Sequence, residues 1–180
     1  MSKIIDLNYV KKEQDKFSKY LESTKGINTQ TNTLKVSEGQ ILALASELYE
    51  VINESKIHKA YDKNVDRERL IEELSDCLSM IGNIANSLNM DLVVEMEITQ
   101  IENIEKQFIG LNYDILRLNK VSKSSIARRK LEELIVPQFI NIVYSLGFNL
   151  DELKEAYFKK MKKNYSNPKF MESWYYEKRS

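Results

Sequence analysis

Hydrophobic residues recur roughly every three to four positions along most of this chain, a spacing typical of amphipathic helices that bury one stripe of side chains. The pattern predicts helices over about 5–23, 37–61, 66–89, 90–120, 125–146 and 149–163. No segment of useful length alternates hydrophobic and polar residues as a strand does, and no repeat of solenoid length occurs. We therefore expect an all-α fold, a helical bundle of about five to seven helices.

Residues that start or stop helices support these boundaries. Two pairs have the spacing of a capping box: Ser37 with Gln40, and Asn149 with Glu152. Pro137 lacks a backbone N–H, so we expect it to kink or divide its helix. Gly147 suits the position just after a helix end. The polar segment 24–33 is expected to be a loop, and the chain from Pro168 onwards a non-helical tail.

Composition agrees with a helical protein. Hydrophobic residues make up 42% of the 180 residues, and five glycines with two prolines are few for a chain with many β-turns. The length suits one domain spanning 1–180. Lys and Arg together number 27, as do Asp and Glu, so the formal net charge is zero. We therefore expect neither membrane association nor specific nucleic-acid binding.

Cysteine content and the N-terminal sequence bear on the compartment. Cys77 is the single cysteine, which excludes an internal disulfide. The first residues lack the apolar core of a signal peptide, and no window is apolar enough to cross a bilayer. We expect a cytoplasmic protein.

Two segments, 44–50 and 70–76, share the pattern Leu-x-x-Glu-Leu-x-acidic, which occurs nowhere else in the chain. In each segment the leucines lie on the apolar stripe of a predicted helix. The acidic residues border that stripe: Glu47 and Glu50 in the first, Glu73 and Asp76 in the second. If the two stripes pack as an antiparallel pair, the four carboxylates converge.

Converging carboxylates favour a metal site. Two like charges about 5–6 Å apart repel by roughly 3 kcal/mol at an effective dielectric near 20. Four half-buried carboxylates thus need cations or raised pKa values. Their hard oxygens suit Mg²⁺ or Mn²⁺. The alternative is that the acidic pairs are ordinary solvated flanks, as a single pair usually is; the repeated leucine framing favours the metal site.

The spacing of these acids also resembles a known signature. Glu47-x-x-Glu50, then 22 intervening residues, then Glu73-x-x-Asp76 is similar to the metal-binding motif of the all-α nucleotide pyrophosphatases. That superfamily includes dimeric dUTPases, MazG-type enzymes and phosphoribosyl-ATP pyrophosphatase. Segments 14–17, 50–61, 72–80 and 157–164 resemble the dimeric dUTPase branch, particularly its compact bacterial and phage members. Segment 91–147 matches no motif and is a candidate helical insertion.

Several positions depart from the pattern of that branch. Tyr61 stands where Trp is usual, Ser79 and Met80 replace His and Phe, and Asn167 replaces an Arg. These departures leave the base and sugar selectivity open.

The resemblance implies a nucleoside triphosphate diphosphatase that hydrolyses dUTP, and also dUDP, to dUMP and so cleans the nucleotide pool. It implies a homodimer and two or three Mg²⁺ ions, for which Mn²⁺ could substitute. Glu47, Glu50, Glu73 and Asp76 would be the metal ligands. By analogy, Glu47 is also the expected catalytic base.

The resemblance, together with helical spacing, suggests a set of substrate contacts. Gln14 would meet the base, Tyr61 would stack on it, and the basic C-terminal residues would meet the phosphates. The candidates are Gln14, Asn53, Lys59, Tyr61, Asn86, Tyr157, Lys160, Asn164 and Lys169. Without the resemblance, the lysines and Gln14 are interpreted as surface residues and Tyr61 as a core aromatic.

Two other functions are compatible with these residues. One is a MazG-like nucleotide pyrophosphatase with another base preference, since the His and Phe equivalents are absent. The other is a non-catalytic helical interaction or regulatory protein, for which the acidic residues would have no role. Measuring the turnover of several nucleotides with and without Mg²⁺ distinguishes these functional hypotheses.

Overall fold

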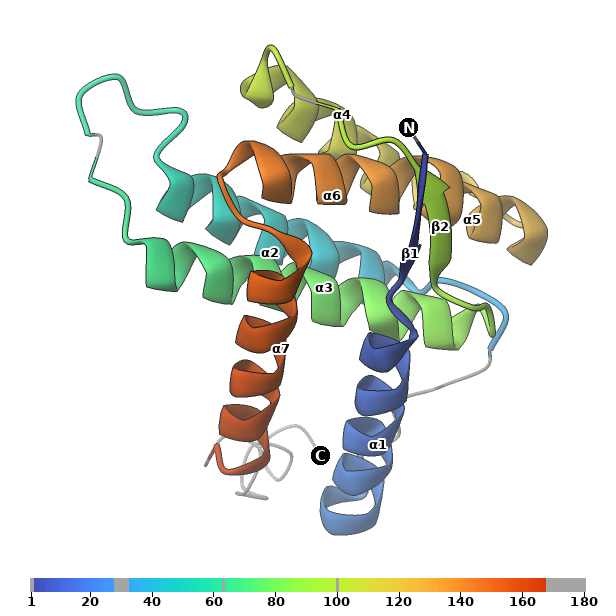
Figure 1. Ribbon diagram of the computed structural model, residues 1–180. Coiled ribbons are helices and arrows are strands. Elements are labelled where there is room, and N and C mark those ends of the chain that lie inside the picture. The colour runs from blue at the N-terminus through green and yellow to red at the C-terminus, as the bar shows by residue number, and fades with distance from the viewer. Residues whose placement is uncertain (1, 28–32, 63, 100, 168–180) are drawn as a thin grey trace.

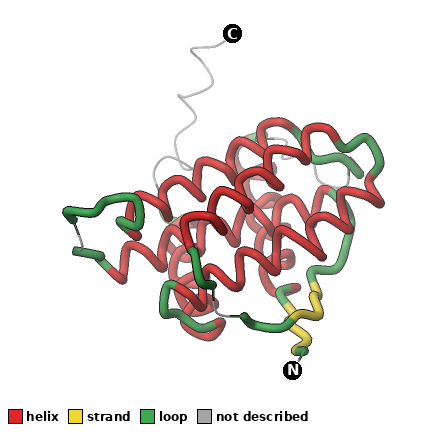
Figure 2. The backbone as a smooth tube through the Cα atoms, turned by 90° about the horizontal axis from the view of Figure 1, so that it is seen from above, coloured by secondary structure: helices red, strands yellow, loops and turns green. Residues whose placement is uncertain are grey.

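A computed structural model describes residues 2–27, 33–62, 64–99 and 101–167. The fold is all-α, as the sequence predicts, with a two-stranded sheet at one end (Figures 1 and 2). The elements in chain order are β1 (Lys3–Asp6), α1 (Asn8–Lys25), α2 (Glu38–Ser55), α3 (Arg67–Ser87), β2 (Val93–Met96), α4 (Ile104–Arg117), η1 (Leu118–Lys120), α5 (Ser124–Lys130), η2 (Leu131–Ile135), α6 (Val136–Ser145) and α7 (Leu150–Tyr165).

Helices α2 and α3 form the centre of the molecule and run antiparallel to each other (Figure 1). Their facing stripes are those expected from the sequence: Leu44, Leu48 and Val51 on α2, and Leu70, Leu74 and Cys77 on α3. Each of these residues is at most 2% exposed. Burying a leucine side chain contributes roughly 1.5–3 kcal/mol, so this contact holds the two acidic segments together.

Helices α1 and α7 cross α3 on its other side and lie next to each other (Figure 1). Aromatic pairs join them, with Phe17 and Tyr165 at 5.0 Å and Tyr9 and Tyr157 at 5.9 Å between ring centroids. The approach of α1 to α3 is close at Gly82, where an added Cβ would lie 2.6 Å from Cγ1 of Val10. A side chain at this position would force the helices apart.

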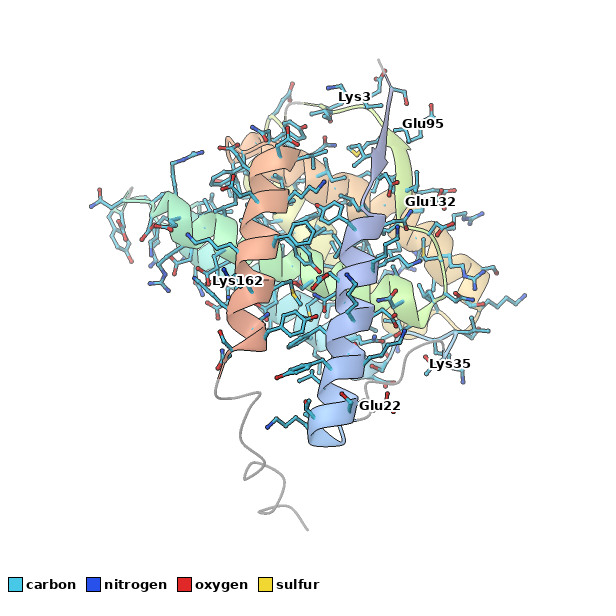
Figure 3. The ribbon with its side chains drawn as sticks, turned by 60° about the horizontal axis from the view of Figure 1, so that its bottom comes forward. Lys3, Glu22, Lys35, Glu95, Glu132 and Lys162 are labelled. Atoms are coloured by element: carbon cyan, nitrogen blue, oxygen red, sulfur yellow. The ribbon has the colours of Figure 1, made fainter. Side chains whose placement is uncertain are left out.

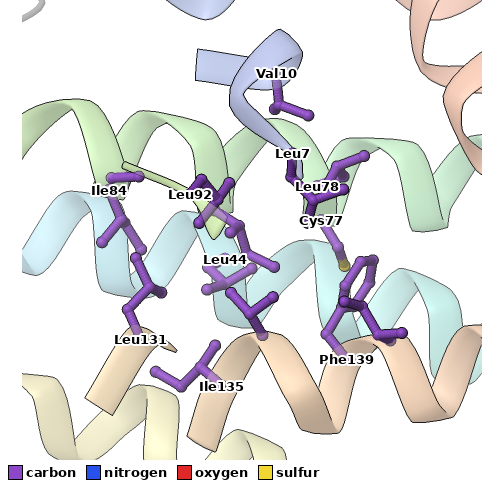
Figure 4. Close-up of a cluster of buried hydrophobic side chains, with 14 of the residues drawn as sticks. Leu7, Val10, Leu44, Cys77, Leu78, Ile84, Leu92, Leu131, Ile135 and Phe139 are labelled. Atoms are coloured by element: carbon purple, nitrogen blue, oxygen red, sulfur yellow. The ribbon is translucent and has the colours of Figure 1, made fainter. Parts of the chain in front are cut away.

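The remaining helices complete one core. Helix α4 packs against α2 and α6, so segment 91–147 shares the main hydrophobic cluster. Figure 4 shows residues from this segment, such as Leu131 and Phe139, beside Leu44 and Cys77 of the central pair. Charged side chains such as Lys3, Glu22, Glu132 and Lys162 are exposed (Figure 3). Among the described residues, no helix is long and apolar enough to cross a membrane.

The sheet corrects two expectations. The first helix begins at Asn8, because residues 3–6 form β1, and the stretch 90–120 is interrupted by β2. The strands pair antiparallel, with Ile5 opposite Val94. The side chain of Asn8 then accepts a hydrogen bond from the N–H of Leu92 at 2.9 Å. Strands of four residues are too short for alternation to stand out from a helical period.

Helix ends agree with the sequence where a capping residue marks them. Both predicted capping boxes are present, and Gly147 adopts a left-handed φ of 82°. The end of α2 was expected near residue 61 but lies at Ser55, because Lys56 adopts a left-handed φ of 55°. The division expected at Pro137 takes the form of the π-helical turn η2, which ends two residues before the proline.

Candidate active site

Three carboxylates converge between α2 and α3. Glu47 comes from α2, and Glu73 and Asp76 come from α3. One carboxylate oxygen of each lies within 4.8 Å of the others, and all three side chains are partly buried. The antiparallel packing of the leucine stripes therefore brings the two acidic borders together, as the sequence predicts.

The carboxylates of this cluster disfavour one another's charge. Burial raises the pKa of Glu47, and the charges of Asp76 and Glu73 raise it further. The pKa of Glu73 is raised by burial first and then by Asp76. Such a cluster stabilises a bound cation, because a cation removes the repulsion that the protein alone must sustain.

Glu50 lies at the edge of the cluster. Its side chain is exposed, and it does not belong to the group whose oxygens lie within 4.8 Å. Its charge nevertheless raises the pKa of both Glu47 and Glu73. The structure thus places three of the four expected ligands together and the fourth beside them.

A lysine of α7 faces the cluster. Nζ of Lys160 lies 2.7 Å from Asp76 and 3.1 Å from Glu72. Glu72 also pairs with Lys163 at 3.0 Å. Burial alone would lower the pKa of Lys160, but the hydrogen bonds and charges of Asp76 and Glu72 raise it overall. The ammonium therefore stays charged and partly neutralises the acidic side chains.

The donor set fits a hard divalent cation. Carboxylate oxygens are the ligands that Mg²⁺ and Mn²⁺ prefer, and Mg²⁺ commonly uses a few carboxylates with water and substrate phosphates. The partial exposure of Glu47, Glu73 and Asp76 leaves room for such additional ligands. Cys77 is fully buried, and burial raises the pKa of its thiol well above the usual range, so it offers no thiolate.

A cavity of about 410 Å³ opens beside the cluster. Asp76 forms part of its wall, together with residues of α1, α2, α3 and α7, among them Gln14, Gln40, Ser79, Met80, Asn83 and Asn164. Its volume is in the range of small-molecule sites, which combine an apolar lining with a few polar groups. A ligand in this cavity would contact the acidic cluster through Asp76.

Gln14 is a buried polar residue of this wall that the sequence singled out. It is 4% exposed, in contrast to the surface position considered for it. Its Nε2 donates to the hydroxyl of Tyr157 at 3.2 Å and approaches Sδ of Met161 at 3.2 Å. The side chain is held from α7 while it lines the cavity.

Tyr157 lies in the core and does not face a cavity that could hold phosphates. It is fully buried, and its hydroxyl donates to the carbonyl of Val10 at 3.2 Å. Burial raises the pKa of this phenol. The phosphate contact expected of Tyr157 is therefore not available in this arrangement, since its single proton is already used.

The other expected substrate residues are scattered. Lys160 and Asn164 lie at the cluster and the cavity. Tyr61 is 88% exposed in the loop after α2, so it is not a core aromatic, and Lys59 lies in the same loop. Asn53 is exposed on α2. Lys169 lies outside the described residues.

Asn86 contributes to a different cavity. Its Nδ2 donates to the carbonyl of Lys11 at 2.9 Å, and it lines a separate hollow beside the start of α1. Asn83 and Ser87 of the same helix do line the 410 Å³ cavity, whereas Asn86 lies on a different face of α3 and points towards α1. Its role in the structure is to tie α3 to α1.

Several residues of the cavity and the acidic cluster were not predicted as site residues from the sequence. Gln40 was seen only as a helix cap, yet its Nε2 also donates to Ser87 at 2.7 Å across the cavity wall. Asn83 lines the cavity one turn beyond Ser79. Glu72, next to the motif residue Glu73, pairs with two lysines of α7. Its position one turn before Asp76 was the available signal.

Comparison with known proteins identifies the family. None of the curated proteins compared matches the chain. A family model described as dUTPase matches residues 6–169, which includes the acidic cluster, the cavity wall and Lys160. The match and the helical fold agree with the resemblance drawn from the acidic motif. The chain therefore belongs to the all-α dUTPase family and is a hydrolase of the dUTP diphosphatase type.

Proposed function

We propose that this protein hydrolyses dUTP, and also dUDP, to dUMP in a Mg²⁺-dependent reaction. The observation that carries the proposal is the cluster of Glu47, Glu73 and Asp76 beside a cavity of nucleoside size whose wall includes Asp76. The family match supports dUTP as the substrate. The convergence of carboxylates supports the metal requirement.

The acidic side chains would hold the metal. Glu47, Glu50, Glu73 and Asp76 are the proposed ligands of two or three Mg²⁺ ions, with Mn²⁺ as a substitute. Bound Mg²⁺ would neutralise phosphate charge and lower the pKa of the attacking water. Glu47 is the proposed base, as the resemblance implies, and its partly buried carboxylate belongs to the acidic cluster that would hold the metal and its water.

Side chains of α7 would bind the phosphates of the substrate. Lys160 already lies at the acidic cluster, and Asn164 lies four residues further along the same helix at the cavity. We propose that both meet the polyphosphate, with Lys169 following them. Contacts from Asn53, Lys59 and Tyr61 stay predictions, since these residues lie at the end of α2 and the loop beyond it.

A nucleotide panel tests the proposal. With Mg²⁺ present, dUTP should give dUMP at rates far above those for dCTP and dTTP, and removal of Mg²⁺ with a chelator should abolish turnover. Glu47→Gln should lower kcat by about 10²–10⁴, the usual contribution of a positioned base. The matched control is Glu132→Gln, an exposed glutamate of η2, which should leave turnover unchanged.

Two results would contradict the proposal. Equal turnover of all nucleotides would indicate a pyrophosphatase with a different base preference. Full activity of Glu47→Gln would remove the acidic cluster from the mechanism.

A further inference from the structure

The amide of Gln14 is held in one orientation by two acceptors on α7. An amide nitrogen carries two hydrogens. In Gln14 one is directed to the hydroxyl oxygen of Tyr157 and the other to Sδ of Met161, each at 3.2 Å. Both groups are buried, Tyr157 at 0% and Met161 at 2% exposure, so solvent does not compete for these contacts.

The hydrogen bonds of Tyr157 and Met161 disfavour the opposite orientation of the amide. The phenol has one proton, and it is donated to the carbonyl of Val10 at 3.2 Å. As long as this bond to Val10 is kept, the hydroxyl oxygen accepts a hydrogen bond from Gln14. Turning the amide over would set its carbonyl oxygen against the lone pairs of the Met161 sulfur, and would either repel the Tyr157 oxygen or cost the bond from Tyr157 to Val10.

The carbonyl of Gln14 is then the polar end left for a ligand. Gln14 lines the 410 Å³ cavity. Among the described residues, no donor to its Oε1 is found, whereas both hydrogens of Nε2 are used. The cavity wall thus presents an acceptor at this position and no amide donor.

We propose that Tyr157 and Met161 are positioning residues that fix the Gln14 carbonyl as an acceptor for a ring N–H of the base. This inference rests on the proposed function and deepens it. Uracil carries a hydrogen at N3, whereas N3 of cytosine is a bare acceptor that would face the carbonyl oxygen. Thymine carries the same N3–H as uracil. The fixed Gln14 carbonyl therefore disfavours cytosine and does not distinguish uracil from thymine.

This asymmetry gives a test that general damage to the fold does not mimic. Tyr157→Phe keeps the ring but removes the acceptor, so the amide can turn and present its nitrogen. The ratio of kcat/KM for dUTP to that for dCTP should fall about tenfold, the value of roughly one hydrogen bond. The ratio for dUTP to dTTP should stay unchanged, and the change should lie mainly in KM.

Two further variants complete the design. Met161→Leu keeps the volume but removes the sulfur acceptor, and should shift the dUTP-to-dCTP ratio in the same direction by a smaller factor. It also serves if Tyr157→Phe fails to fold. Tyr9→Phe is the control, because the Tyr9 ring packs edge-on against Tyr157 while its hydroxyl takes no part in holding Gln14. It should leave both ratios unchanged.

Binding of dUMP and dCMP without metal, followed by calorimetry, separates this inference from the proposed reaction. Wild-type protein that prefers dUMP, with the preference reduced in Tyr157→Phe, supports the positioning role even if dUTP turnover is absent. An absent preference in the wild-type protein overturns it. So does a preference that Tyr157→Phe and Met161→Leu both leave intact, or an equal fall in both triphosphate ratios.

Discussion

At the scale of single residues, the acidic cluster stores repulsion that a cation relieves. Burial and the neighbouring charges of Asp76 and Glu73 raise the pKa of Glu47, so the metal-free protein holds this carboxylate at a cost. Natural sites commonly sacrifice stability in this way for function. The same side chain is therefore expected to weaken the folded protein and to be needed for its chemistry.

Replacing Glu47 should separate these two effects. Glu47→Gln removes one of three converging charges while keeping the side-chain shape. In the absence of divalent cations, the free energy of unfolding should rise by about 1 kcal/mol, a value reduced by the partial exposure of the site. Urea unfolding measures it, with Glu132→Gln as the exposed control. A less stable Glu47→Gln protein would mean that the cluster is not under repulsion.

Tyr9 gives a pH dependence that is independent of the metal site. Burial, and then the charge of Asp151, raise its pKa to about 12. Between pH 10 and 12 the folded protein therefore holds a proton that the unfolded chain releases, so stability falls as pH rises. The contribution should be complete below about pH 10 and lost through pH 12. Unfolding curves of wild type and Tyr9→Phe should diverge only in this range; parallel curves would contradict the shift.

At the scale of elements, the sequence predicted what local chemistry determines. The capping residues of α2 and α7 are side chains that bond to their own helix, so their pattern is readable. The strands β1 and β2 could not be predicted from local sequence, because each four-residue segment is stabilised by a partner about 90 positions away. The end of α2 depends on the backbone of Lys56, a residue type that gives no turn signal.

The candidate active site also has a part that the sequence predicted and a part that it did not. The convergence of Glu47, Glu73 and Asp76 could be predicted from the helical periodicity of two segments and the assumption that their apolar stripes pack together. The burial of Gln14 and Tyr157 did not, because it depends on how α1 and α7 lie against each other across 143 positions. Single-helix periodicity cannot report which polar residues a distant helix covers.

Lys160 links α7 to the acidic residues of α3, and its removal tests that link. Lys160→Met keeps much of the aliphatic stem but leaves Asp76 and Glu72 without this cation. Without metal, the free energy of unfolding should fall by about 1–3 kcal/mol. Mg²⁺ should then stabilise Lys160→Met more than it stabilises wild type, because the ion replaces the lost charge. Thermal unfolding at increasing Mg²⁺ measures this, and equal stabilisation of both proteins would contradict it.

At the scale of the whole molecule, several large apolar side chains of α2 and α4 are exposed. Five large side chains on the neighbouring helices α2 and α4 are between 43% and 71% exposed: Leu42, Tyr49, Ile109, Tyr113 and Leu116. Helices α2 and α4 pack against each other, and Asn112 of α4 donates to the hydroxyl of Tyr49 at 3.1 Å. We call these five side chains the α2–α4 surface. Exposed apolar patches of this kind mark interaction sites.

We propose that this α2–α4 surface pairs with a second copy of the chain, in line with the homodimer implied by the resemblance. A two-fold interface uses the same patch on both subunits, so one substitution acts twice. Wild-type protein should sediment at about twice the chain mass of 21.1 kDa, and Ile109→Asp should sediment as a monomer. Ile4→Asp is the matched control, because Ile4 is 75% exposed but lies on β1. A monomeric wild type would contradict the dimer, whereas dissociation by Ile4→Asp alone would move the interface to the sheet end of the molecule.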